Sequence, residues 1–258
     1  MFRATLVYLF VGIYVAIAAP IGMIWALLSG KASHLFGLAR ICVRLAGWMS
    51  GIRLKVSGRE RLIPGETYLF LSNHQGNFDG PILFHATGRN LCAVIKIEIM
   101  RIPMLSAVFR RADFIPIDRT DPVQARTTID RAARLLKEGH SFFAFPEGTR
   151  SRDGHLGVFK KGVFVMALKG GVPVVPVSIR NSRGIQPPGR YAIIPATVEV
   201  IFHNPIPTEG LQMEDRDRLL QMTRAAIAEG MSGGIVAGAV PPADRPISMP
   251  ADDQSCRR

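Results

Sequence analysis

The chain has 258 residues, of which 48% are hydrophobic, and its formal net charge is +12 at pH 7. This length allows one sizeable core with a flanking segment or two, and the charge indicates nucleic acid, an acidic membrane surface or an anionic substrate as partner. Cys42, Cys92 and Cys256 show no spacing typical of a zinc site or a disulfide framework, which indicates a reducing compartment.

The first fifty residues predict two membrane-associated helices. Residues 4–28 carry no charged side chain and are long enough to cross a bilayer, although Pro20 also allows a kink or a re-entrant shape. Residues 33–50 place apolar side chains at helical spacing, with Arg40 and Arg44 off that stripe. This pattern is typical of a helix lying on a membrane surface, with an ordinary core helix as the alternative. Basic residues cluster after the apolar segment, which places the downstream domain in the cytoplasm.

From residue 52 onward, strands alternate with helices. Short apolar or alternating runs predict strands at residues 53–56, 68–71, 91–97, 114–117, 141–145, 174–179 and 197–202. Helices are predicted after the N-cap Asp121, ending at Gly139, and at residues 161–169 and 213–229. The pattern predicts an α/β fold with a mixed sheet flanked by helices.

Three parts follow from this pattern. They are the N-terminal membrane-anchoring helices at residues 1–50, a folded domain at residues 51–230, and a disordered tail at residues 231–258. The tail is rich in Gly, Pro and Ala and has little apolar content, so it is not expected to form a core.

The strongest chemical signal follows the strand at residues 68–71 directly. It reads Asn-His-Gln-Gly-Asn-Phe-Asp and spans residues 73–79. His74 and Asp79 can turn toward each other, so that the carboxylate orients the imidazole and leaves its other nitrogen to take a proton. An imidazole titrates near neutrality and suits general-base chemistry. Taken alone, the pair is also compatible with a structural turn, and the backbone near Gly76 is a candidate oxyanion donor.

Three further segments contain residues suited to an anion. Residues 145–151 read Phe-Pro-Glu-Gly-Thr-Arg-Ser after a strand, where Gly148 and Arg150 can offer a backbone N–H and a guanidinium. Residues 114–119 form an apolar strand that ends in Asp-Arg, and residues 172–177 an apolar strand with two prolines. Taken one at a time, these segments are also compatible with ion pairs in loops or with an edge strand. Lys96 and Lys160 are added as point charges for a phosphate.

Together, the segments NHxxxxD, IDR, FPEGTRS and VPVVPV resemble, in this order, the glycerophospholipid acyltransferase family, and most closely its bacterial 1-acylglycerol-3-phosphate acyltransferases. The resemblance covers about residues 53–206, and Gly76 stands where the family usually has Ser. It implies that His74 is the catalytic base and that Asp79 orients it, within a catalytic domain at residues 51–230. It places in the acyl-acceptor pocket Arg119, Glu147, Gly148, Thr149 and Arg150, and residues 174–177 beside the acyl or acceptor site.

The resemblance implies acyl transfer from acyl-CoA or acyl carrier protein to the free hydroxyl of lysophosphatidic acid, which gives phosphatidic acid. The site is expected at the cytoplasmic face of the cell inner membrane among membrane lipids, with no bound cofactor or metal. A lyso-ornithine lipid, another lysophospholipid and glycerol 3-phosphate stay open as acceptors, as do the chain length and the oligomeric state. Arginine–phosphate contacts account for the basic charge without nucleic acid. A non-catalytic lipid-binding membrane protein is the alternative from another class.

Residues 230–234 read Gly-Met-Ser-Gly-Gly and formally match the nucleophile motif of serine hydrolases. That motif needs a strand before it and a histidine after it. A predicted helix precedes it here, and no histidine follows His203. The sequence therefore excludes a serine hydrolase of this type.

Overall fold

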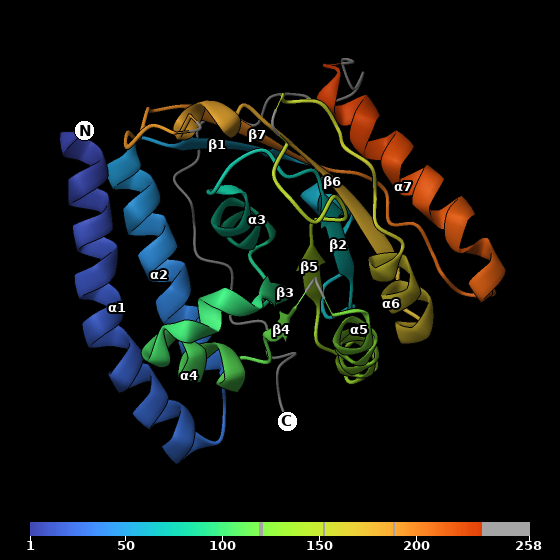
Figure 1. Ribbon diagram of the computed structural model, residues 1–258, viewed down its shortest axis with the longest axis horizontal. Helices are drawn as coiled ribbons and strands as arrows, with labels where there is room; N and C mark the ends of the chain where they lie inside the picture. The colour runs from blue at the N-terminus through green and yellow to red at the C-terminus, as the bar shows by residue number, and fades with distance from the viewer. Residues whose placement is uncertain (119–120, 152, 188, 234–258) are drawn as a thin grey trace.

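A computed structural model of the protein describes residues 1–118, 121–151, 153–187 and 189–233 (Figure 1). Its strands are β1 (Arg53–Ser57), β2 (Leu69–Ser72), β3 (Cys92–Lys96), β4 (Ile115–Ile117), β5 (Phe142–Ala144), β6 (Val174–Arg180) and β7 (Thr197–Phe202). Its α-helices are α1 (Phe2–Ser29), α2 (Ser33–Ser50), α3 (Asp79–Thr87), α4 (Pro103–Arg111), α5 (Pro122–Lys137), α6 (Gly162–Gly170) and α7 (Arg216–Met231).

The strands form one mixed sheet in the order β1-β7-β6-β2-β5-β3-β4. Strands β6 and β7 are antiparallel, and the other neighbouring pairs are parallel. The five strands from β2 to β6 therefore run in one direction and end at one edge of the sheet. In open α/β sheets, ligands bind outside this carboxyl edge.

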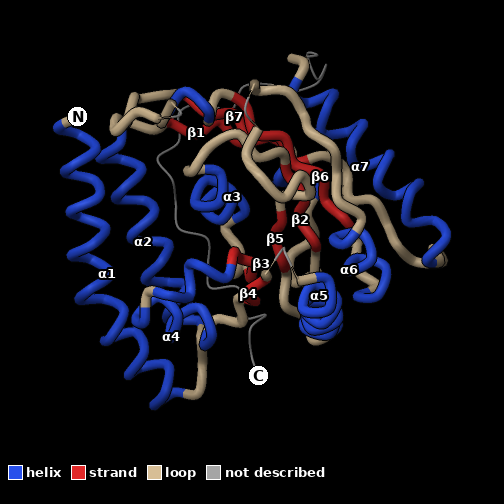
Figure 2. Tube along the Cα trace, in the orientation of Figure 1, coloured by secondary structure: helices blue, strands red, loops and turns tan. Residues whose placement is uncertain are grey.

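Helices cover both faces of this sheet. Helices α5, α6 and α7 lie on one side, while α3 lies on the other, with α2 outside α3 and α1 outermost (Figures 1 and 2). The central strand β2 is buried along its whole length, and β6 is buried except at its last residue. This double cover explains why both strands are continuous apolar runs rather than alternating ones.

The predicted mixed α/β architecture is confirmed, and each predicted strand lies within one or two residues of an observed one. Asp121 caps α5 as predicted, because its side chain accepts hydrogen bonds from the N–H groups of Val123 at 2.9 Å and Gln124 at 3.1 Å. The helix predicted at residues 213–229 is a 3-10 turn at Met213–Asp215 followed by α7. Helix α7 includes Met231, where the tail was predicted to begin, and residues 234–258 of that tail lie outside the described residues.

Neither α3 nor α4 is predicted from the sequence pattern. Helix α3 has nine residues and begins Asp-Gly-Pro, and most of its side chains are buried, including Ile82, Leu83 and Phe84. A short helix whose side chains are mostly buried has little polar face, so it lacks the periodic pattern by which helices are recognised. Helix α4 begins with Pro103, a residue favoured in the first turn.

Helices α1 and α2 pack side by side along the domain. Gly22 of α1 faces Leu38 of α2, and a Cβ atom at Gly22 would lie 2.6 Å from Leu38 Cδ1. The hydroxyl of Tyr14 donates to the carbonyl oxygen of Leu38 at 3.0 Å. Near the C-terminal end of α1, Arg111 of α4 donates to the carbonyl oxygen of Ala26 at 3.2 Å. The absence of a side chain at Gly22 lets the helices approach closely, and α1 continues through Pro20 as one helix.

The outer face of α1 is apolar and exposed. Its bulky side chains there include Ile13, Ile17, Ile21, Ile24 and Leu28. Within the described ranges, α1 is the one helix that is long and apolar enough to cross a membrane by length and composition.

On the inner side of these two helices, Phe36 of α2 packs near Phe84 of α3, with ring centroids 6.3 Å apart. The N-terminal segment therefore packs against α3, which covers the sheet.

Candidate active site

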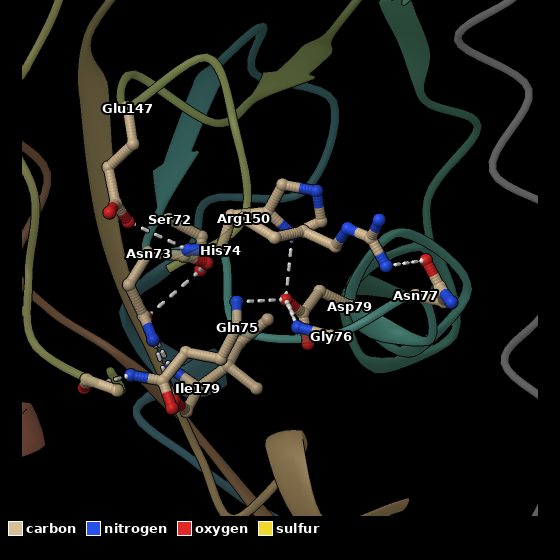
Figure 3. A network of polar contacts seen from close by, with 11 residues as sticks. Ser72, Asn73, His74, Gln75, Gly76, Asn77, Asp79, Glu147, Arg150 and Ile179 are labelled. Atoms are coloured by element: carbon tan, nitrogen blue, oxygen red, sulfur yellow. Dashed lines mark hydrogen bonds and ion pairs between the residues drawn. The ribbon is translucent and has the colours of Figure 1, made fainter. Parts of the chain in front are cut away.

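The predicted His–Asp pair forms where β2 ends and α3 begins. The Nδ1 atom of His74 lies 2.8 Å from Oδ2 of Asp79, whose side chain is fully buried, while the His74 side chain is 20% exposed (Figure 3). The same Oδ2 accepts hydrogen bonds from the backbone N–H groups of Gln75 at 2.6 Å and Gly76 at 2.7 Å. Since Oδ2 is an acceptor for all three groups, Nδ1 carries the proton and Nε2 is left to accept one.

The start of this loop is attached to the sheet. Asn73 is buried, its side-chain N–H donates to the carbonyl oxygen of Ile179 at 2.8 Å, and its Oδ1 accepts from the N–H of Ile179 at 2.8 Å. The amide thus bridges the end of β2 to β6 (Figure 3). This paired contact holds the residue immediately before His74.

The ring of Phe145 covers one face of the imidazole. Its centroid lies 4.0 Å from that of His74, and the two planes are 13° apart. Phe145 comes directly after β5, the neighbour of β2, so the carboxyl ends of two adjacent strands bring the rings together. The residue belongs to a motif recognised in the sequence, but no pattern there indicated its contact with His74.

Glu147 points inward rather than toward the surface. Its Oε1 accepts a hydrogen bond from the backbone N–H of His74 at 2.9 Å (Figure 3). Its Oε2 accepts one from the backbone N–H of Gly157 at 2.9 Å. The side chain is buried, with 6% of its surface exposed. The resemblance placed Glu147 in the acceptor pocket, whereas its carboxylate here binds the backbone of two loops.

Other predicted anion-binding residues of this loop are exposed beside the His74 loop. Arg150 donates from Nη1 to Oδ1 of Asn77 at 2.5 Å, and Thr149 is exposed next to it. Gly148 has a φ of 72°. A Cβ atom there would lie 2.9 Å from Cε of Lys160, so the aliphatic part of the Lys160 side chain packs against this glycine. Arg150 and Lys160 therefore bring positive charge to the loop around the base.

The remaining two predicted cations belong to the far strands. Lys96 ends β3 at the same carboxyl edge and pairs with Oε1 of Glu98 at 2.8 Å, with both side chains exposed. Arg119 follows β4 but lies outside the described residues. In the described part of the chain, no group of three or more His, Cys, Asp or Glu side chains is arranged to hold a metal ion.

Gly76 does not offer the oxyanion donor that its position suggested. Its N–H is buried and donates to Asp79 Oδ2, so this group is already engaged. A Cβ atom at Gly76 would lie 3.0 Å from the carbonyl oxygen of Ser182 and 3.7 Å from Asp79 Oδ1. This Oδ1 is buried and has no hydrogen-bond partner among the described residues. The serine usual at this position would bring a hydroxyl next to that oxygen, at the cost of a tight contact with Ser182.

A serine–histidine contact lies between the sheet and α7. The hydroxyl of Ser178 lies 2.8 Å from Nε2 of His203 and donates to the carbonyl oxygen of Ile227 at 2.9 Å. Ser178 is fully buried, and burial together with the charge of Arg61 lowers the pKa of His203, against the opposing effect of Glu229. This contact holds α7 on the sheet.

The serine of the formal hydrolase motif follows helix α7 rather than a strand. The hydroxyl of Ser232 donates back to the carbonyl oxygen of Glu229 at 2.8 Å, in the last turn of that helix. The geometry of a nucleophile elbow is therefore not formed here, in agreement with the sequence argument.

Comparisons with known proteins find acyltransferases as relatives. Residues 53–180 match the family model described as Acyltransferase. The 1-acyl-sn-glycerol-3-phosphate acyltransferase of Limnanthes douglasii is 30% identical over 199 residues, which cover 77% of this chain and 69% of that protein. A chloroplastic enzyme of the same name from Arabidopsis thaliana is 36% identical over 181 residues, covering 69% of this chain and 49% of that protein.

The chain thus spans about half the length of some curated relatives. The crystal structure of the 1-acyl-sn-glycerophosphate acyltransferase of Thermotoga maritima has the same fold, with a TM-score of 0.73. It is 24% identical, and the match covers 88% of this chain and 96% of that one. The sequence motifs, the paired His74 and Asp79 and these relatives lead to one conclusion: the chain belongs to the acyltransferase family that contains the 1-acyl-sn-glycerol-3-phosphate acyltransferases.

Proposed function

We propose that this protein transfers an acyl group from an acyl thioester to the free hydroxyl of 1-acylglycerol 3-phosphate, giving phosphatidic acid. The observation that carries the proposal is the imidazole of His74, held through Nδ1 by buried Asp79 at 2.8 Å and still partly exposed. The names of the relatives support this acceptor. The donor is acyl-CoA or acyl carrier protein, used as a co-substrate without a bound cofactor.

The reaction needs one base, because a thioester is already activated. Nε2 of His74 removes the proton of the acceptor hydroxyl, and the oxygen attacks the thioester carbonyl carbon to give a tetrahedral intermediate. The intermediate collapses as the C–S bond breaks, and the proton passes from His74 to the leaving thiolate. The products are phosphatidic acid and a free thiol, with no acyl-enzyme.

Cations at the carboxyl edge bind the phosphate of the acceptor. Arg150 is exposed beside the His74 loop, and Lys160 crosses Gly148 in the same region. A guanidinium suits bidentate phosphate contacts, and lysine adds a point charge. Lys96 at the end of β3 joins this set, and the exposed hydroxyl of Thr149 adds a neutral donor. Arg119, which follows β4 in the sequence but lies outside the described residues, is proposed as a further phosphate ligand.

The N-terminal helices hold the enzyme at the cell inner membrane, with the catalytic domain facing the cytoplasm. The exposed apolar face of α1 and exposed Trp48 of α2 support contact with lipid. Because α1 stays packed against α2 and Arg111, the lipid-facing surface and the active site belong to one body. A lipid acceptor can then enter the site without leaving the bilayer.

The test is an acceptor panel with purified full-length protein in lipid nanodiscs. Labelled acyl-CoA and acyl carrier protein are each offered with lysophosphatidic acid, lysophosphatidylethanolamine, lyso-ornithine lipid or glycerol 3-phosphate. We expect phosphatidic acid as the main product and a loss of about 10³-fold in kcat for His74→Ala. Product formation by His74→Ala at the native rate would refute the general base. A preference for another acceptor would refute the substrate, and lipid binding without any transfer would favour a non-catalytic protein.

A further inference from the structure

The carboxylate of Glu147 connects two loops at the residue that bears the base. One oxygen accepts the N–H of His74, and the other accepts the N–H of Gly157, each at 2.9 Å. A buried carboxylate is stable only when its oxygens are hydrogen-bonded, and here both are. At 6% exposure, it has little surface left to offer a substrate.

The carbonyl group of His74 is bound by the same loop. The N–H of Ser151 donates to the His74 carbonyl oxygen at 2.8 Å. One residue further on, the side-chain N–H of Gln75 donates to the carbonyl oxygen of Gly154 at 2.8 Å. Both backbone groups of His74 are thus held by the segment 147–157, while its side chain is held separately by Asp79 and Phe145.

We propose that Glu147 is a positioning residue, which sets the place of the His74 backbone and acts on the reaction only through the imidazole. The inference rests on the proposed function, because it concerns the base of that reaction. Asp79 and Phe145 orient the ring about the side-chain bonds, and Glu147 fixes the point from which those bonds start. A displacement of about 1 Å at a catalytic group costs roughly 10²-fold in rate.

The first experiment is the substitution Glu147→Gln in the full-length enzyme. Glutamine keeps the size of the side chain, but its NH2 group cannot accept a hydrogen bond, so one of the two backbone N–H groups loses its acceptor. We expect kcat to fall by about 10- to 100-fold, while KM for lysophosphatidic acid stays within about twofold of native. The matched control is Glu209→Gln, because Glu209 is exposed on a loop.

A second variant reaches the same contact from its other end. A Cβ atom at Gly157 would lie 2.8 Å from Oε2 of Glu147, so Gly157→Ala pushes the carboxylate out of place. The φ of Gly157 is not positive, which leaves crowding as the effect of the change. We expect the same loss in kcat at unchanged acceptor KM. Gly184→Ala is the control, since a Cβ there meets nothing within 4 Å.

The decisive measurement combines Glu147→Gln with His74→Ala. If Glu147 acts through the base, the double variant has the residual rate of His74→Ala alone, because effects of residues that act as a unit are not additive. Calorimetry should also give the same dissociation constant of 1-oleoyl lysophosphatidic acid for the double variant and for His74→Ala. A tenfold weaker binding caused by Glu147→Gln in either background would overturn the proposal and make Glu147 an acceptor ligand. Native activity of His74→Ala would instead refute the proposed function itself.

Discussion

The loop of His74 and the helix α1 are held by different kinds of contact. His74 is bound at its side chain by Asp79, on its ring face by Phe145, and at its backbone by Glu147 and Ser151. The buried residues of helix α1 are mostly small, such as Ala4, Gly22 and Ala26, and many of its bulky apolar side chains are exposed. Hydrogen bonds are directional and fix single atoms in place, as the proposed base requires. Hydrophobic contact is non-directional, so an apolar face can move along a lipid surface. The predictions below test this difference.

The largest effect is expected where the directional contacts converge. Asp79→Asn replaces an oxygen that accepts three hydrogen bonds by an amide that either loses acceptors or turns its NH2 group toward N–H donors. The imidazole then loses its fixed tautomer, and kcat should fall by about 10³-fold or more. Steady-state kinetics with lysophosphatidic acid measure this loss. Asp130→Asn is the control, because Asp130 forms an exposed pair with Lys169. Near-native activity of Asp79→Asn would show that the pair is only structural.

The second largest effect is expected on the exposed apolar face of α1. Ile17 and Ile24 on α1 are 60% and 59% exposed, so lysine at both positions should leave the fold intact and weaken vesicle binding by about tenfold or more. Co-sedimentation with vesicles of phosphatidylglycerol and phosphatidylethanolamine measures the partition. Ile63→Lys is the control, because Ile63 is 62% exposed but lies outside α1. Unchanged sedimentation of the double variant would mean that α1 does not face lipid.

A smaller effect is expected for an exposed cation of the active-site loops. Arg150→Ala removes a guanidinium that the fold holds through a contact with Asn77 at 2.5 Å. If this group binds the phosphate, KM for lysophosphatidic acid should rise by about 10-fold, and KM for the thioester should stay constant. Arg218→Ala on α7 controls for the loss of one positive charge. Equal changes in both KM values would contradict a role in phosphate binding.

The smallest effect is expected at a third place, the buried contact between Ser178 and His203 that holds α7 on the sheet. The pKa of His203 is lowered mainly by burial, so the unfolded chain binds a proton more readily than the folded one. The resulting stability is fully present above about pH 6.5 and is lost as the pH falls through the lower folded pKa.

Thermal melting between pH 7.5 and pH 5 tests this effect. His203→Gln keeps a donor for Ser178 but does not titrate, so its Tm should fall about 2–4 °C less than that of the native protein over this range. His155→Gln is the control, because His155 is exposed. His85 titrates in the same direction, since burial, Arg44 and Arg59 lower its pKa, so part of the loss should remain. An equal loss in the native protein and His203→Gln would exclude His203 as its source.

The regular elements could be predicted from sequence wherever a local pattern exists. Strands β2 and β6 are apolar runs between turn residues, and α5 has its own cap and proline. Helix α3 could not be predicted, because the burial of most of its side chains removes the polar stripe that identifies a helix. The two apolar N-terminal helices were predictable from composition, but their packing against α3 and α4 was not.

The residues of the candidate active site likewise differ in whether a local sequence pattern predicts their contacts. His74 and Asp79 are five positions apart, so the loop between a strand and a helix is enough to bring them together, and the sequence alone determined this pair. Phe145 and Glu147 reach His74 only because β2 and β5 are neighbours in the sheet, and Gly157 in turn binds Glu147. Strand order is a property of the whole chain, since it depends on which apolar faces are buried together. Only the tertiary structure therefore decided that Glu147 binds the backbone N–H of His74, and that α1 lies along the domain with its apolar side exposed.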